Sequence, residues 1–312
     1  MTSDWQEALE ILHPGPQTTV QDLGRFGHLR DGVPVSGAFD FLAHRIANLT
    51  VGNPVLCATL EIALSRFAVR ALGPIWVALA GRGLRLRRNG TEADASRALR
   101  LGNGDILEVA GSGTGARGYL AVRGGFAVSP VLGSRSTFLP AGFGGYRGRA
   151  LRAADRLHAF RAETEVPAPS EGVAKLRAEH AFAELGTLEY LSIGTRASLD
   201  SLIWRVSSVS NRIGLRLEPV TGARLSGRFS GSIPSTAVVP GAIQVPPDGA
   251  PVILGADAQT VGGYPLLGAV IHADLWKLGQ LAGGATVRLR ATSRANAVAR
   301  SQALAFAPRR LS

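Results

Sequence analysis

The chain has 312 residues, of which 46% are hydrophobic and 18% are charged, so it can bury a core and is not disordered by composition. Its 39 glycines and 17 prolines follow no collagen-like period and favour many short strands joined by turns. No apolar stretch approaches the roughly 20 residues of a membrane-spanning helix. The first residues lack the basic start and apolar core of a secretory signal, and the single cysteine, Cys57, can form no intrachain disulfide. We therefore expect a cytoplasmic protein.

The formal net charge of +11 raises the question of nucleic acid or an acidic membrane surface as a partner. Lysine occurs only at Lys175 and Lys277, and the many arginines are scattered, as a bias toward GC-rich codons would produce. Aromatic residues make up only 6%, too few for a base-stacking platform. We favour a solvated basic surface with neither nucleic acid nor membrane as partner, while a small anionic ligand or an acidic protein stays open.

Short apolar or alternating runs between glycine turns predict strands along most of the chain. The clearest examples are 9–12, 75–79, 106–109, 119–122 and 252–254. Helical patterns are few, and they predict helices over 39–51, 273–281 and 295–306. The first of these ends at Gly52-Asn53-Pro54. The sequence thus favours a mainly β protein with a few short helices.

Three pairs of segments recur at nearly equal spacing, which favours an internal duplication. The segment 9–15 resembles 188–194 at an offset of 179 residues, and 101–109 resembles 281–289 at an offset of 180. The looser match of 75–81 with 251–257 has an offset of 176. Between the two halves, the polar, proline-containing stretch 163–187 is typical of a linker. We expect a first domain over 1–162, a linker over 163–187 and a second domain over 188–312.

Several common catalytic motifs are absent from the sequence. It contains no phosphate-binding P-loop and no G-x-S-x-G nucleophile turn. The glycine-rich run 111–115 precedes another strand pattern, so it predicts a turn and not a phosphate site. The six histidines show no metal-ligand spacing, and neither lysine lies in a biotin-attachment context. We expect no metal site and no biotin attached to this chain.

Polar residues interleaved with glycines form the first candidate cluster, over 18–27 and 32–40. Gln21, Asp22, Arg25 and Asp40 offer directional donors and acceptors, and Arg25 could bind a carboxylate through both guanidinium nitrogens. The same residues could equally form a turn that is capped by Asp22 and tied by an Asp22–Arg25 pair. The sequence leaves these two interpretations evenly balanced.

Two further clusters combine arginine with glycine-rich backbone. Arg135 lies in 133–137 and Arg149 in 142–149, where arginines could bind an anion, although exposed loops with solvated arginines are slightly favoured. Asn211 and Arg212 precede Ile213-Gly214 and could form either a turn cap or a ligand clamp. The residues alone do not separate these alternatives.

The fourth cluster is Asp257 to Pro265, which follows a strand-like segment at 241–246. Asp257 could act as a base or orient a donor, while Gln259 and Tyr264 could hold an amide or a carbonyl oxygen. Tyr264 could also be a corner residue whose hydroxyl ties down a turn. Asp257 by itself does not indicate catalysis, because no second titratable group lies close to it in sequence.

Taken in order, these clusters resemble the family named for allophanate hydrolase subunit 2, which is also called the biotin-dependent carboxyltransferase family. The motifs that carry the resemblance are TTVQDLGRFG (18–27), GVPVSGAFD (32–40), ANLTVGNP (47–54), LE (60–61), YLAVRGGF (119–126), LGSRST (132–137), GGYRGR (144–149), SNRIG (210–214) and DAQTVGGYP (257–265). The set is specific although each piece alone is weak. Within the family, the motifs are most similar to the C subunits of bacterial 5-oxoprolinases.

The resemblance implies two tandem cyclophilin-like β-barrel domains and a role within an ATP-dependent 5-oxoprolinase complex. That complex, a hydrolase of cyclic amides, converts 5-oxo-L-proline to L-glutamate and contains a B subunit, of the allophanate hydrolase subunit 1 family, and an A subunit. ATP is used by the complex at a location that the resemblance does not give. One alternative is a carboxyltransferase component that moves a carboxyl group from carboxybiotin to urea or another amide. Another is a non-catalytic binding module that regulates a partner protein.

The resemblance also implies a small amide or lactam held between the two barrels. The residues expected to act on the amide are Asp40, Asp257, Gln259 and Tyr264. Those expected to bind and shape the site are Gln21, Asp22, Arg25, Arg135, Arg149, Asn211, Arg212 and Gln244.

Overall fold

The computed structural model describes residues 4–63, 66–162, 165–166, 168–193, 199–220, 225 and 233–309. Glu163 and Pro167 of the expected linker, and Gly194 of the duplicated segment, lie outside the described residues. The chain divides into two compact units. Among the described residues, the first contains those up to Arg25 and Ser36–Ala183, and the second contains Phe26–Val35 and those from Glu184 to Arg309.

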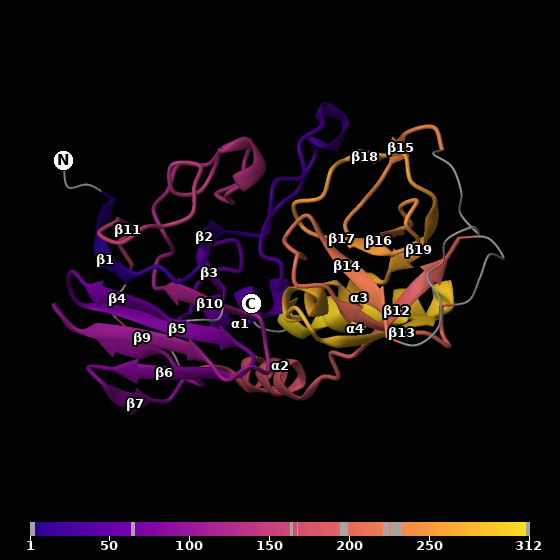
Figure 1. The fold of residues 1–312 in the computed structure, drawn as a ribbon. Helices are drawn as coiled ribbons and strands as arrows, with labels where there is room; N and C mark the ends of the chain where they lie inside the picture. The colour runs from indigo at the N-terminus through magenta and orange to yellow at the C-terminus, as the bar shows by residue number, and fades with distance from the viewer. Residues whose placement is uncertain are drawn as a thin grey trace. The chain divides into compact units, whose positions relative to one another are not determined.

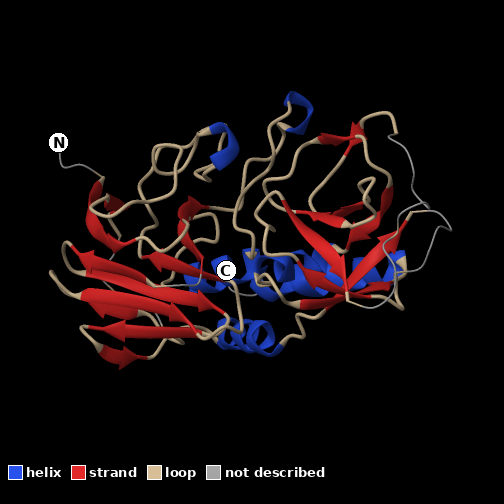
Figure 2. Ribbon diagram, viewed as in Figure 1, coloured by secondary structure: helices blue, strands red, loops and turns tan. Residues whose placement is uncertain are grey.

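The strands of the first unit form two antiparallel sheets (Figures 1 and 2). The six-stranded sheet has the order β11 (Arg156–Phe160), β1 (Trp5–His13), β4 (Phe67–Ala71), β9 (Ile106–Gly111), β6 (Leu84–Arg88) and β7 (Thr91–Ala93). The five-stranded sheet has the order β2 (Thr18–Gln21), β3 (Thr59–Ala63), β10 (Arg117–Val122), β5 (Ile75–Gly81) and β8 (Leu99–Leu101).

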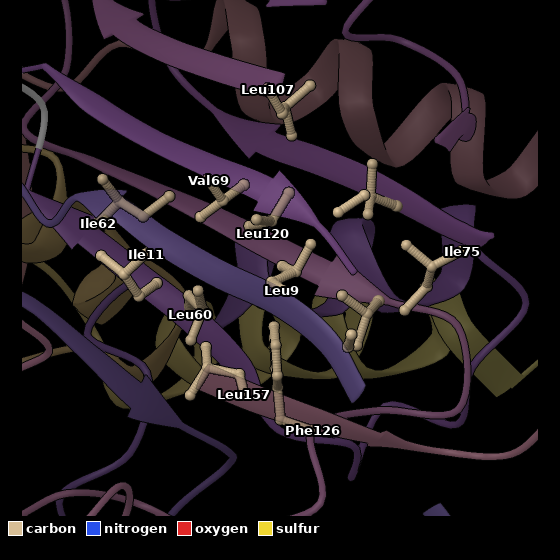
Figure 3. Close-up of a cluster of buried hydrophobic side chains, with 14 of the residues drawn as sticks. Leu9, Ile11, Leu60, Ile62, Val69, Ile75, Leu107, Leu120, Phe126 and Leu157 are labelled. Carbon is tan, nitrogen blue, oxygen red and sulfur yellow. The ribbon is translucent and has the colours of Figure 1, made fainter. Parts of the chain in front are cut away.

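One hydrophobic core joins the two sheets of the first unit. Alternate residues along each strand point inward, so Leu9 and Ile11 of β1 meet Leu60 and Ile62 of β3 in the same buried cluster. Figure 3 shows these side chains together with Val69, Leu107 and Leu120. Each fully buried aliphatic side chain of this kind contributes about 1.5–3 kcal/mol through removal from water. This burial fixes the strand ends that carry the polar motifs.

The described residues of the first unit form two α-helices. The helix α1 (Phe41–Thr50) begins at the N-cap Asp40, whose carboxylate accepts a hydrogen bond from the Ala43 backbone N–H. The helix α2 (Glu171–Phe182) begins at the N-cap Ser170 and lies within the stretch expected to be a linker. A short 3₁₀ turn, η2 (Leu139–Ala141), completes the unit.

The second unit is a closed barrel. Its order is β12 (Thr187–Ser192), β19 (Leu266–Val270), β16 (Ala242–Gln244), β17 (Val252–Leu254), β14 (Gly214–Pro219), β13 (Ile203–Val206) and β20 (Thr286–Ala291), and the parallel pairing of β12 with β20 closes it. A separate two-stranded ribbon pairs β15 (Thr236–Ala237) with β18 (Val261–Gly262). The unit also holds η1 (Leu29–Asp31), α3 (His272–Leu275), η3 (Trp276–Gly279) and α4 (Arg294–Arg309).

The mainly β class with few helices is confirmed. The strands expected at 9–12, 75–79, 106–109, 119–122 and 252–254 fall within β1, β5, β9, β10 and β17. The helices expected over 39–51 and 295–306 correspond to α1 and α4, whereas the helix expected over 273–281 divides into α3 and η3. Among the described residues, hydrogen bonds close a barrel in the second unit and leave two open sheets around one core in the first.

The segments matched by the duplication are strands in both units, with different neighbours. β1 and β9 of the first unit are separated by β4, whereas their counterparts β12 and β20 pair directly. The sequence pattern therefore predicts where strands lie along the chain, but it does not predict which strands pair. Within the described part of the chain, no helix is both long and apolar enough to cross a membrane.

Candidate functional site

The Asp22 carboxylate is the shared hydrogen-bond acceptor of the loop that follows β2. Its Oδ1 accepts hydrogen bonds from the hydroxyls of Ser134 (2.6 Å) and Ser136 (2.5 Å) and from the Gly24 backbone N–H (2.8 Å). Its Oδ2 accepts from the Arg135 backbone N–H at 2.5 Å. Burial raises the pKa of this carboxyl, but the combined hydrogen bonds outweigh burial and lower the pKa below its usual value. Asp22 is thus an ionised anchor that ties the 132–137 motif to the end of β2.

Arg25 is buried in the same loop cluster, with only 1% of its surface exposed. Its guanidinium donates to the Ser136 carbonyl at 2.5 Å and lies over the Phe143 ring, 4.8 Å from the centroid. Gly144 packs against it, since a Cβ at that position would lie 2.8 Å from Nη2. The structure therefore places Arg25 inside the loop packing, and its role as a carboxylate ligand stays a prediction.

Gln21 is also fully buried, at the end of β2. Its amide nitrogen donates to the Thr19 hydroxyl (3.0 Å) and to the Thr137 carbonyl (3.1 Å). Together with Asp22 it joins the first motif to the 132–137 motif. The structure brings three of the predicted motifs into one polar cluster, which fits the scaffold interpretation of these residues.

Asp40 belongs to a buried network that joins both helices of the first unit. Besides capping α1, its Oδ2 lies 2.6 Å from Nε2 of His180 on α2, and its backbone N–H donates to the Tyr119 hydroxyl at 2.8 Å. The Tyr119 hydroxyl in turn donates to Glu61 at 2.7 Å. Burial, followed by the charges of Glu61 and Asp40, raises the pKa of Tyr119 well above its usual value, so it remains a donor. Asp40 has no exposed surface, and its catalytic role stays a prediction.

His44 is a further buried titratable group in the first unit. Its ring nitrogens lie 2.9 Å from the Thr59 hydroxyl and 2.9 Å from the Val55 carbonyl. Burial lowers the pKa of His44 to about 4, so the imidazole is neutral at neutral pH. Its hydrogen bond to Thr59 links α1 to β3.

The two predicted site arginines of the 132–149 region, Arg135 and Arg149, have separate partners. Arg135 donates to the Val128 carbonyl at 2.9 Å and lies over the Phe160 ring. Arg149 holds both oxygens of Asp155, at 2.7 Å each, and stacks on Tyr146. Hydrogen bonding to Asp155 is the main cause that raises the pKa of Arg149. Anion binding by either arginine stays a prediction.

The second unit contains a buried ion pair at its predicted motifs. Nε and Nη2 of Arg212 donate to the two carboxylate oxygens of Asp257 at 2.7 and 3.0 Å. Only 4% of each residue is exposed. The backbones also run side by side, because the Asp257 N–H donates to the Arg212 carbonyl and the Gly255 N–H donates to the Ile213 carbonyl. The pair therefore fixes two sequence motifs to each other.

Exposed polar side chains stand next to this ion pair in sequence. Asn211 and Gln259 are exposed, and Tyr264 retains 43% of its surface. Gln259 Nε2 donates to Oε1 of the buried Gln244 at 3.2 Å. Amide and phenol groups of this kind can bind a carbonyl oxygen or an amide N–H, so this loop can contact a small amide.

The predicted site residues are therefore divided between the two units. Six of the predicted residues belong to the first unit: Gln21, Asp22, Arg25, Asp40, Arg135 and Arg149. Six belong to the second: Asn211, Arg212, Gln244, Asp257, Gln259 and Tyr264. The expectation of a hollow shared by both barrels stays a prediction.

The sequence does not predict the buried partners His180 and Tyr119. His180 lies in the stretch expected to be a linker, and Tyr119 lies in a family motif to which no role is assigned. A histidine in an Ala/Glu-rich stretch, 140 residues from its aspartate partner, gives no local signal. Within the described residues, no group of three or more His, Cys, Asp or Glu side chains could hold a metal ion.

Comparison with known proteins finds a matching family model and several similar proteins. The family model for the carboxyltransferase domain, subdomains A and B, matches residues 31–291. The C subunit of the 5-oxoprolinase of Escherichia coli K12 is 38% identical over 276 residues, which cover 88% of this chain and 87% of that protein. The C subunit of the Haemophilus influenzae 5-oxoprolinase is 33% identical over 287 residues, which cover 91% of each.

A solved structure shows the same fold. The crystal structure of Kluyveromyces lactis urea carboxylase matches 98% of this chain with a TM-score of 0.82 and 30% identity. The match covers 30% of the urea carboxylase chain.

Proposed function

Because this chain belongs to the carboxyltransferase-domain family with subdomains A and B, we propose that it is the C subunit of an ATP-dependent 5-oxoprolinase. In that reaction water adds across the lactam C–N bond of 5-oxo-L-proline. The carbonyl carbon becomes the side-chain carboxylate of L-glutamate, and the ring nitrogen becomes its amine. Hydrolysis of ATP by the complex drives the ring opening. The chain would work in the cytoplasm together with the A and B subunits of the complex.

The observation that carries this proposal is similarity over most of the length of two 5-oxoprolinase C subunits. Identity to the Escherichia coli protein, which is named as the C subunit of 5-oxoprolinase, extends over 88% of this chain and 87% of that protein. The urea carboxylase, by contrast, is matched over only 30% of its length. Identity is also higher to the 5-oxoprolinase subunit, at 38%, than to the urea carboxylase, at 30%, which favours the first role.

The exposed loop of the second unit supports the proposed substrate class. A lactam presents one carbonyl oxygen and one N–H, and Tyr264 and Gln259 offer a donor and an acceptor on exposed side chains. The Tyr264 hydroxyl would donate to the lactam oxygen, where negative charge develops as water adds. Arg212 would hold Asp257, and with it the backbone that leads to Gln259, in one position.

The test is reconstitution of the complex from three purified subunits. With 5-oxoproline and ATP, the complex should form glutamate and ADP in equal amounts, and omission of this chain should abolish glutamate formation. A complete three-subunit complex that hydrolyses ATP without forming glutamate would exclude the proposal.

Carboxyl transfer is the second candidate, because the family model and the urea carboxylase fold both point to it. In that reaction the carboxyl group leaves the biotin nitrogen and bonds to an amide nitrogen of urea or a related amide, which gives up a proton. Incubation with a carboxylated biotin carrier protein and urea distinguishes the candidates, since only a carboxyltransferase would return free biotin and a carboxylated amide. Failure of both assays would favour a non-catalytic module that binds a partner protein.

A further inference from the structure

Two amide side chains in the second unit differ in burial although they contact each other. Gln244 is the last residue of β16, pairs in register with Val252 and Leu266, and is 2% exposed. Gln259 is exposed and lies on the loop between Asp257 and β18. The hydrogen bond between them runs from Gln259 Nε2 to Gln244 Oε1 at 3.2 Å. This direction determines which atoms of Gln259 remain for a ligand.

The backbone of Gly262 packs closely against the amide of Gln244. Gly262 of β18 lies against it, since a Cβ at Gly262 would come within 2.4 Å of Gln244 Nε2. That nitrogen has no hydrogen-bond partner among the described residues. The absence of a side chain at Gly262 therefore lets the buried amide fit beneath the ribbon, with Oε1 toward Gln259.

The backbone of Gln259 is fixed on both sides. Two residues before it, the Asp257 N–H donates to the Arg212 carbonyl at 3.0 Å. One residue after it, the Thr260 carbonyl accepts from the Val238 N–H at 3.0 Å. The side chain therefore extends from a held backbone segment, and its hydrogen bond to Gln244 restrains the terminal amide.

We propose that Gln244 is a positioning residue. By accepting a hydrogen bond from the amide nitrogen of Gln259, it turns the amide oxygen of Gln259 toward the ligand, so that the loop selects ligands with an amide N–H. Gln259 uses one N–H on Gln244, which leaves its Oε1 as the acceptor for the ligand. An N–H of a lactam or of urea matches this acceptor, whereas an ether-type ring oxygen at the same place would be repelled. The inference rests on the proposed function in taking a small cyclic amide as the ligand.

The experiment compares two ligands that differ at one atom. The first is 5-oxoproline, and the second is its γ-lactone counterpart, in which a ring oxygen replaces the N–H. Their equilibrium dissociation constants are measured on the three-subunit complex without ATP. The wild-type complex should bind the lactam about tenfold more tightly than the lactone, the ratio expected for one hydrogen bond of about 1.4 kcal/mol.

Three variants separate positioning from simple structural support. Gln244→Met keeps the volume and removes the acceptor, so the amide of Gln259 can rotate, and the lactam-to-lactone preference should fall to about threefold or less. Gln244→Glu keeps an acceptor oxygen facing Gln259 and should retain the preference. Gln259→Met changes an exposed residue, leaves folding intact and should remove the preference even if Gln244→Met does not fold. Gln302→Met, at an exposed site on α4, is the matched control and should bind as the wild type does.

The outcomes separate the inference from the proposed reaction. An unchanged preference in either Met variant at position 244 or 259, or equal binding of both ligands by the wild type, would overturn the inference. Absence of binding of both ligands would also overturn it. Preferential binding of the lactam by a complex that forms no glutamate would support the inference and reject only the proposed reaction, because binding requires no turnover.

Discussion

The two units treat a buried aspartate in a glycine-rich motif in different ways. Asp22 of the first unit is held by serine hydroxyls and backbone N–H groups, and its neighbours Gln21 and Arg25 are buried with it. Asp257 of the second unit is held by the Arg212 guanidinium, and its neighbour Gln259 is exposed. Motifs that look alike in sequence thus form a buried, hydrogen-bonded cluster in the first unit and a loop with an exposed side chain in the second. Whether the side chains next to the aspartate are buried or exposed therefore distinguishes a structural motif from one that can contact a ligand.

The largest expected effect is on the ion pair of the second unit. Arg212→Ala leaves the buried Asp257 carboxylate without its cation, and we expect a loss of about 4 kcal/mol in the free energy of unfolding. Urea unfolding followed by circular dichroism measures this. The double variant Arg212→Met with Asp257→Leu should recover most of the loss, because it removes both charges. A loss below about 1 kcal/mol for Arg212→Ala would show that the pair does not hold the loop.

Acid should destabilise the first unit through His44. Its pKa is about 4 in the folded chain against 6.5 for the unfolded reference. Between these pH values the unfolded chain binds an additional proton, so the free energy of unfolding falls as the pH falls from 6.5 toward 4, by about 3 kcal/mol. Urea titrations at several pH values test this. His44→Gln should flatten the profile in that window, and an equally steep profile in the variant would refute the assignment.

A smaller effect is expected at the Asp22 carboxylate. Ser136→Ala removes a hydroxyl that donates to the carboxylate, and the loss should be about 2 kcal/mol, as for hydrogen bonds to charged groups. Ser129→Ala, at an exposed position of the same unit, is the control and should change stability by less than about 0.5 kcal/mol. If both variants were equally stable, Asp22 would not be the anchor of the 132–137 motif.

The smallest effect on stability, and a large one on activity, is expected at Tyr264. Tyr264→Phe removes an exposed hydroxyl and should change the free energy of unfolding by less than about 0.5 kcal/mol. In the reconstituted complex, kcat/KM for 5-oxoproline should fall by about 100-fold if the hydroxyl stabilises the developing charge on the lactam oxygen. Unchanged kinetics would place Tyr264 outside the reaction and favour its interpretation as a corner residue.

Much of the fold follows from local sequence patterns. The alternation that buries Leu9 and Ile11, and the Asp40 cap before α1, are signals contained within a few residues. The family motifs likewise identify the segments that meet at Asp22 and at Asp257. These features could be predicted because neighbouring residues determine them.

The partners of the polar side chains could not be predicted in this way. His180 reaches Asp40 across 140 residues, and Arg177 of the same helix donates to the Leu79 and Ala95 carbonyls. The buried apolar residues of that helix are Val173 and Leu176, too few to give its sequence a clear hydrophobic period. Whether Arg25 or Gln259 is exposed also depends on contacts that form only in the folded unit.

The most direct test of the central claim compares Gln259→Ala with Gln302→Ala in the reconstituted complex. Both residues are exposed glutamines of the second unit. We predict equal thermal stability for the two variants, and a fall of about tenfold in kcat/KM for ATP-dependent glutamate formation from 5-oxoproline only for Gln259→Ala. Full activity of Gln259→Ala would contradict the account, because the loop beside the Arg212–Asp257 pair would then not contact the substrate.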